Sequence, residues 1–172
     1  MSDAQEILKR VAITETSVER EITYRDNDGK EQKEIFALAR FADAGDLDDL
    51  YRKMENRDKQ RKAAKGKLAV ILEAGTWEPF LDQLKNPKKL ADGKLEVYLS
   101  SKTTIGIATA IEAGIREASF SWGQAVLLTM INGPLAFELS AQIMKLNGME
   151  AKEAAKKGSN PTDSEQEDSG DS

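Results

Sequence analysis

The longest uncharged stretch of the chain, Ala118 to Phe137, predicts buried helices, because a helix that is apolar all round must be covered by protein or lipid. Beyond it, one helical stripe is formed by Leu135, Leu139, Ile143 and Leu146. Asn132-Gly133-Pro134 lies between the two halves, where Pro suits the first turn of a new helix. Residues 119–146 are therefore predicted to form a helical hairpin or one sharply kinked helix.

An alternating pattern predicts a β-hairpin near the N-terminus. Val18, Ile22 and Tyr24 are separated by polar residues, which is typical of a half-buried strand. Asp26-Asn27-Asp28-Gly29 supplies turn residues before a return strand at about 30–38. The acids also suggest a calcium loop, but the spaced ligands and distal Glu of such a loop are missing, so a plain turn is favoured. A two-stranded ribbon is marginal alone and should pack on the helices or pair with another chain.

Most of the remaining chain is predicted to be helical. Residues 1–14 form a short helix with Ile7, Leu8 and Val11 on one side, and Asp43 or Asp46 caps a longer one. Residues 94–99 are ambiguous between a strand and the approach to a helix.

A helix rich in small residues is predicted to start at Ser100 or Ser101. Gly106 and Gly114 lie inside it, where each costs about 1 kcal/mol relative to Ala, so close approach of another helix is the expected compensation. Asn147-Gly148 is a helix-stop signal. A short exposed helix is predicted over residues 149–157.

These elements predict a mainly α fold with a small N-terminal β-ribbon. Its parts are an N-terminal arm (1–17), a mostly helical domain with the hairpin at 18–38 (18–157), and an acidic tail (158–172). The tail holds five acids and no base, and it is expected to be disordered because it has almost nothing to bury.

The amino-acid composition excludes most kinds of catalytic site. The chain has no His and no Cys, which excludes imidazole and thiol catalysis, disulfides, and imidazole or thiolate metal ligands. Ser100-Ser101-Lys102 and the pair Ser140 and Lys145 match no nucleophile motif, and the glycines form no phosphate loop. We therefore predict no enzyme activity, catalytic residue, metal site, cofactor or small-molecule substrate.

The uncharged stretch is long enough to cross a membrane. Against that, Ser119, Ser121, Gln124, Thr129 and Asn132 interrupt it, and its flanks show no one-sided excess of Lys or Arg. A buried helix is the preferred interpretation. The absence of Cys and of a signal peptide fits the cytoplasm.

A basic segment at residues 52–67, with eight bases and two acids, raises the alternative of nucleic-acid binding. Its candidate docking patch is Arg57, Lys59, Arg61 and Lys62. No aromatic follows Tyr51 in the segment for base stacking, and the chain without its tail carries 25 acids and 25 bases. A solvated helix face, or a docking site for an acidic partner or for the protein's own tail, is therefore favoured.

The order of these features resembles the tail assembly chaperones of long-tailed bacteriophages. The resemblance is carried by the ribbon EREITYRDNDGKEQKEIFAL, the capped segment Asp46-Leu47-Asp48-Asp49-Leu50, the apolar helices, and the ending Leu146-Asn147-Gly148 followed by a charged helix. It implies a non-enzymatic, mostly helical protein of the host cytoplasm. Such a protein binds the tape measure protein or the tail tube protein during virion assembly and leaves before maturity.

Keeping an apolar, helix-rich partner soluble calls for an exposed apolar groove. The candidate groove consists of Val126, Leu127, Met130, Leu135, Leu139, Ile143 and Met144. For each of these residues an ordinary place in the core remains the alternative. A homo-oligomer is expected, and a virion structural protein of the tail or neck is the alternative function.

Overall fold

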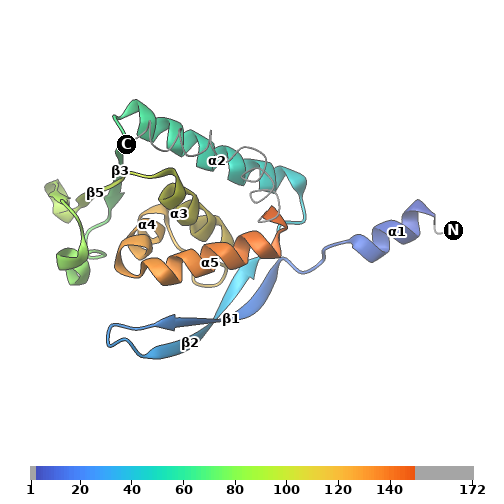
Figure 1. Cartoon of the computed structure of the whole chain (residues 1–172). Coiled ribbons are helices and arrows are strands. Elements are labelled where there is room, and N and C mark those ends of the chain that lie inside the picture. The colour runs from blue at the N-terminus through green and yellow to red at the C-terminus, as the bar shows by residue number, and fades with distance from the viewer. Residues whose placement is uncertain (1–2, 150–172) are drawn as a thin grey trace, which may run out of the picture.

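The computed structural model describes residues 3–149, which form a helical body flanked by two small sheets (Figure 1). The helices are α1 (Ala4–Val11), α2 (Ala44–Ala63), α3 (Lys102–Gly114), α4 (Trp122–Ile131), α5 (Gly133–Leu146) and two short 3-10 helices, η1 (Glu78–Gln83) and η2 (Ala91–Gly93). The strands are β1 (Ser17–Arg25), β2 (Glu31–Ala39), β3 (Leu68–Leu72), β4 (Lys88–Lys89) and β5 (Leu95–Leu99).

The prediction of a mainly α fold with one ribbon is wrong. Among the described residues 51% are helical and 21% lie in strands, and a second antiparallel sheet of order β3-β5-β4 accompanies the ribbon. The missed strand is β3, whose residues alternate between buried and exposed even though all five are apolar. Since Ala69 and Ile71 are apolar on the exposed face, the polar half of the alternating pattern is absent from the sequence. The ambiguous residues 94–99 contain the partner strand β5, with Val70 opposite Val97.

The predicted helical hairpin is confirmed as α4 and α5. Asn132 ends α4 and caps α5, since its side chain accepts a hydrogen bond from the backbone N–H of Leu135, and Pro134 lies in the first turn. Helix α3 lies between α2 on one side and α4 and α5 on the other (Figure 1). It starts at the predicted cap, Ser101, which accepts from the N–H of Thr104.

Gly114 permits the close approach of α3 and α5. A Cβ at Gly114 would lie 2.7 Å from two side-chain carbons of Ile143, which is fully buried and has no room to yield. Nothing lies within 4 Å of a Cβ built at Gly106. The predicted close approach is therefore confirmed for Gly114 and wrong for Gly106.

Gly114→Ala is expected to lower the free energy of unfolding by about 1 to 3 kcal/mol, because a methyl group would be forced into a packed core. The matched variant Gly106→Ala is expected to raise it by up to about 1 kcal/mol, since Ala is the better helix former. Urea unfolding of both proteins, followed by circular dichroism, checks the pair. Equal effects in the two variants would contradict the close contact.

The ribbon confirms the predicted hairpin, and it packs on α5. The carboxylate of Asp26 accepts hydrogen bonds from the Gln32 side chain and from the backbone N–H groups of Lys30 and Asp28. The bond from Gln32, followed by that from Lys30, holds the pKa of Asp26 below its ordinary value. The carboxylate is thus engaged in closing the turn.

Asn147, in the helix-stop signal, joins the end of α5 to the segment that leaves the ribbon. Its side-chain amide donates to the carbonyls of Ala39 and Ile143, and its oxygen accepts from the N–H of Phe41. Gly148 follows with φ of 71°, which suits a glycine at a helix end. This part of the Leu146-Asn147-Gly148 ending is therefore fixed by tertiary hydrogen bonds.

The helix predicted over residues 149–157 and the acidic tail predicted over 158–172 lie outside the described residues, apart from Met149. Within residues 3–149 no helix has both the length and the apolar character that are needed to cross a bilayer.

Candidate functional site

The seven candidate groove residues are divided between the core and the surface. Five have buried side chains, namely Val126, Leu127, Leu135, Leu139 and Ile143, and all five belong to one core shared by α3, α4, α5 and the strands. Met130 and Met144 are half-buried. The structure therefore does not bring the seven together as an open groove, because most of them face this chain's own interior.

The basic segment is largely engaged in contacts within the body. Arg57 donates to Glu112 at 2.9 Å and to the Thr109 hydroxyl at 3.1 Å, and its guanidinium lies 3.5 Å from the centre of the Trp122 ring. These contacts tie α2 to α3 and α4. Arg61 is 2% exposed.

Two of the four patch residues therefore point inward, since Arg61 also donates to the buried carboxylate of Asp58 at 2.8 Å. Lys59 and Lys62 remain exposed, and Lys62 lies 3.8 Å from Asp58. The four residues do not form a continuous basic surface for phosphates, because the guanidinium groups of Arg57 and Arg61 already meet carboxylates of the same chain.

An apolar groove of about 380 Å³ does open on the body, between η1, the segment that follows α3, and the outer side of α4. We call it the η1–α4 groove. It is lined by Thr76, Phe80, Ala118, Ser119, Phe120, Gln124, Leu127, Leu128 and Ile131. Its phenylalanines, Leu128 and Ile131 are only half-buried, so their side chains are available to a bound molecule. Only Leu127 is shared with the predicted groove.

Contacts on both sides hold this groove in place. Trp77 is buried and its indole N–H donates to the carbonyl of Gly93, which fixes the start of η1 against η2. On the other side α4 begins with a capping box between Ser121 and Gln124. Gly123 brings its first turn close to β3, where a Cβ would lie 3.1 Å from the Ile71 carbonyl oxygen.

The surroundings of the groove are acidic. The lining residues carry no charge, and within two positions of them the chain holds three acids, Glu78, Asp82 and Glu117. The one base in the same range is Arg116, whose guanidinium lies over the Phe41 ring. All three carboxylates are exposed, and none forms a salt bridge with another residue of the described chain. The groove thus has an apolar floor and, next to its lining along the chain, three exposed carboxylates that we call its acidic rim. This combination favours an apolar ligand that also carries positive charge.

A second cavity of about 330 Å³ lies between the start of α2 and the end of α3. It is lined by Phe41, Asp46, Asp49, Leu50, Lys53, Ala113 and Arg116. Charges of both signs line it, and no group of three or more acidic, His or Cys side chains suited to a metal occurs in residues 3–149. Nothing in its lining assembles a nucleophile with a base.

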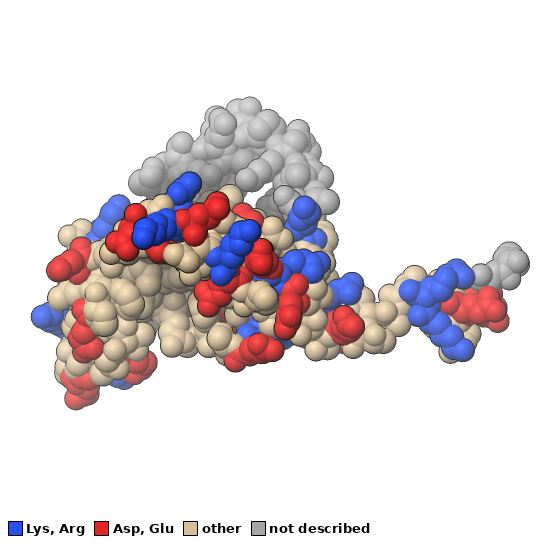
Figure 2. Space-filling model, turned by 90° about the horizontal axis from the view of Figure 1, so that it is seen from below, with Lys and Arg blue, Asp and Glu red and all other residues tan. Residues whose placement is uncertain are grey.

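The predicted N-terminal helix is confirmed as α1, but no residue of it is buried. Ile7, Leu8, Val11 and Ile13 are 43%, 59%, 64% and 36% exposed. Figures 1 and 2 show the helix standing clear of the body at the end of an extended linker. An amphipathic helix with its apolar face uncovered is the second unusual surface of the described chain.

The sequence did not indicate the η1–α4 groove. Its floor comes from two segments about forty positions apart that only the tertiary fold brings together, and η1 is too short to give a helical period. The charge pattern gave no signal either, because the lining from Ala118 to Ile131 is uncharged.

Comparison of the chain with protein-family models, curated proteins and solved structures found no match.

Proposed function

We propose that the protein is a non-enzymatic assembly chaperone that uses the η1–α4 groove to hold an amphipathic, basic helical segment of another protein. Its partner class is the one that the resemblance implies, the tape measure protein or the tail tube protein of a long-tailed phage, met in the host cytoplasm. The observation that carries the proposal is the groove itself, which has half-buried Phe80, Phe120, Leu128 and Ile131 under an acidic rim.

The physical support is the match between such a groove and an amphipathic helix. A helix presents an apolar stripe that fits a groove of this kind. Basic residues on its polar side would be attracted to the acids beside the groove. Aromatic side chains on the floor supply contact area with little conformational entropy to lose. The basic segment is a weaker candidate for binding, because Arg57 and Arg61 are engaged inside the body.

The proposal is tested by co-expressing the protein with the tape measure protein and, separately, with the tail tube protein of the same phage. Soluble partner is expected at a stoichiometric ratio with the wild type. It is expected to be lost with Leu128→Glu, which places a charge on the groove floor. Phe137→Glu is the matched control, since Phe137 is a 59% exposed apolar residue of α5 outside the groove.

Equal loss of soluble partner with both variants would indicate general destabilisation. Circular dichroism of each variant shows whether the variant itself is folded. Retained partner solubility with a folded Leu128→Glu protein would contradict the proposed site. Mass spectrometry of purified particles separates a chaperone from a virion structural protein, since a chaperone should be missing from them.

A further inference from the structure

We propose that α1 of one copy docks into the η1–α4 groove of a second copy, so that the protein assembles head to tail. The occupant of the groove is then the segment Ile7–Ile13 of the same chain. The inference uses the same groove as the proposed function, so α1 and an external partner would compete for it. Self-association is measured without any partner, so its failure is distinguishable from failure of the proposed function.

Helix α1 has an apolar stripe that no other part of the described chain covers. An isolated helix of eight residues is unstable in water, and packing of its apolar face is what normally stabilises such a helix. In α1 the stripe formed by Ile7, Leu8 and Val11 touches no core residue, although Asp3 caps the helix through the N–H of Glu6. We therefore expect another surface to cover this stripe and so stabilise α1 as a helix.

The charges of the two surfaces are complementary. Residues 7–13 (ILKRVAI) hold five apolar residues and two bases, Lys9 and Arg10, and no acid. The residues within two positions of the groove lining hold three acids, and their one base, Arg116, is directed over the Phe41 ring. An apolar, basic segment is thus complementary to an apolar groove with an acidic rim, and such complementarity favours correct pairing and rapid encounter. The nearby acids are Asp3, the N-cap residue, and Glu6 in the first turn of α1, and both lie outside the docking segment.

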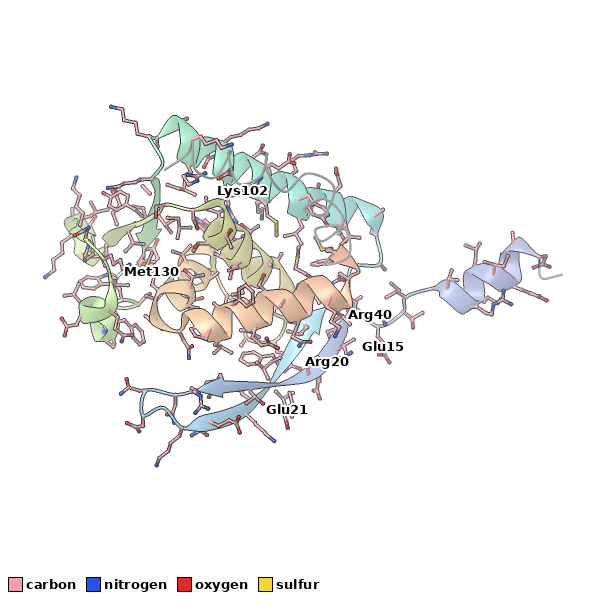
Figure 3. The ribbon with its side chains drawn as sticks, viewed as in Figure 1. Glu15, Arg20, Glu21, Arg40, Lys102 and Met130 are labelled. Carbon is pink, nitrogen blue, oxygen red and sulfur yellow. The ribbon has the colours of Figure 1, made fainter. Side chains whose placement is uncertain are left out.

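The positions of the two surfaces favour docking between copies. Figure 3 shows Glu15, at the root of the arm, and Met130, on α4, on opposite sides of the body. Ser17 pairs with Ala39, which binds Asn147 at the end of α5, whereas the groove residue Ile131 lies just before the start of α5. The fourteen residues of α5 span about 21 Å at 1.5 Å per residue.

Residues 14–16 link the docking segment to β1 and reach about 10 Å when fully extended. Docking within one copy would therefore require this linker to be stretched over the whole length of α5. Docking into a second copy requires no such path. Because arm and groove are different surfaces, the contact is heterologous and propagates into a ring or a chain.

The test is sedimentation velocity of the full chain from about 1 to about 100 µM, a range that covers weak specific association. The wild type is expected to form dimers or larger species as concentration rises. Leu8→Glu removes the arm's stripe and Leu128→Glu blocks the groove, and each alone is expected to remain monomeric. Phe137→Glu is expected to assemble like the wild type.

An equimolar mixture of Leu8→Glu and Leu128→Glu distinguishes docking of α1 into the groove from other modes of self-association. The intact arm of the second variant is expected to enter the intact groove of the first, which gives a 1:1 heterodimer that grows no further. A mixture that stays monomeric while the wild type assembles overturns the proposal. So does a Leu128→Glu protein that still dimerises, since that result indicates arm-to-arm pairing, and so does a monomeric wild type at about 100 µM.

Misfolding of the groove variant is controlled by a second one made only of exposed residues, Glu78→Lys with Asp82→Lys. This variant keeps the apolar floor and reverses the charge of two of the three rim residues. It is expected to weaken self-association at least tenfold at low salt and less at high salt, because the contribution is electrostatic. Unchanged association in this variant also counts against the proposal.

Discussion

Asp58→Ala is expected to lower the free energy of unfolding by about 3 kcal/mol, because it removes one partner of a buried ion pair. The carboxylate of Asp58 accepts from Arg61 at 2.8 Å, and the two side chains are 6% and 2% exposed. Without Asp58 the guanidinium loses this carboxylate while staying largely out of water. Urea unfolding at neutral pH measures the change.

Asp48→Ala is the matched control on the same helix. Asp48 pairs with Arg52 across one helical turn, but both side chains are more than 60% exposed, so the loss should be below about 1 kcal/mol. Similar losses in the two variants would contradict the assignment of the Asp58 pair to the interior.

Leu139→Ala is expected to lower the free energy of unfolding by about 2 to 5 kcal/mol, because Leu139 is fully buried and its truncation leaves a cavity. Phe137→Ala, two residues away on α5, removes a larger side chain that is 59% exposed, and it should change stability by no more than about 0.5 kcal/mol. Thermal and urea unfolding of both proteins check the contrast.

This pair also decides between the two interpretations of the apolar stripe on α5. If Leu139 lined an open groove, its truncation would weaken partner binding and leave stability nearly unchanged. A Leu139→Ala protein as stable as the wild type would therefore show that the stripe is not core.

The elements that the sequence predicted well are those with local signals. The hairpin of α4 and α5 follows from an apolar stripe and from Asn132-Gly133-Pro134, and the ribbon follows from alternation and its turn residues. The helix caps at Asp43 and Ser101 are also read from neighbouring residues. Each of these signals acts over a few positions, so tertiary structure is not needed to interpret it.

The second sheet and the groove depend on contacts between distant segments. Strand β3 shows no polar alternation, and its partner β5 begins 27 positions after β3 begins. The apolar stripe of α5 is the same pattern whether a partner or α3 covers it, and Gly114 against Ile143 shows that α3 does. The bases Arg57 and Arg61 looked available from the sequence because Glu112 lies far along the chain and because a neighbouring acid can equally face solvent.

The most direct measurement is disulfide capture between single-cysteine variants, which give an unambiguous readout because the chain contains no Cys. Leu8→Cys and Leu128→Cys proteins are mixed at equal concentration under mild oxidation, and the products are separated without reductant. A cross-linked heterodimer that exceeds either homodimer is predicted, because the arm of one copy enters the η1–α4 groove of the other. Leu8→Cys homodimers at the same or higher yield, or no cross-linked product, would contradict this account.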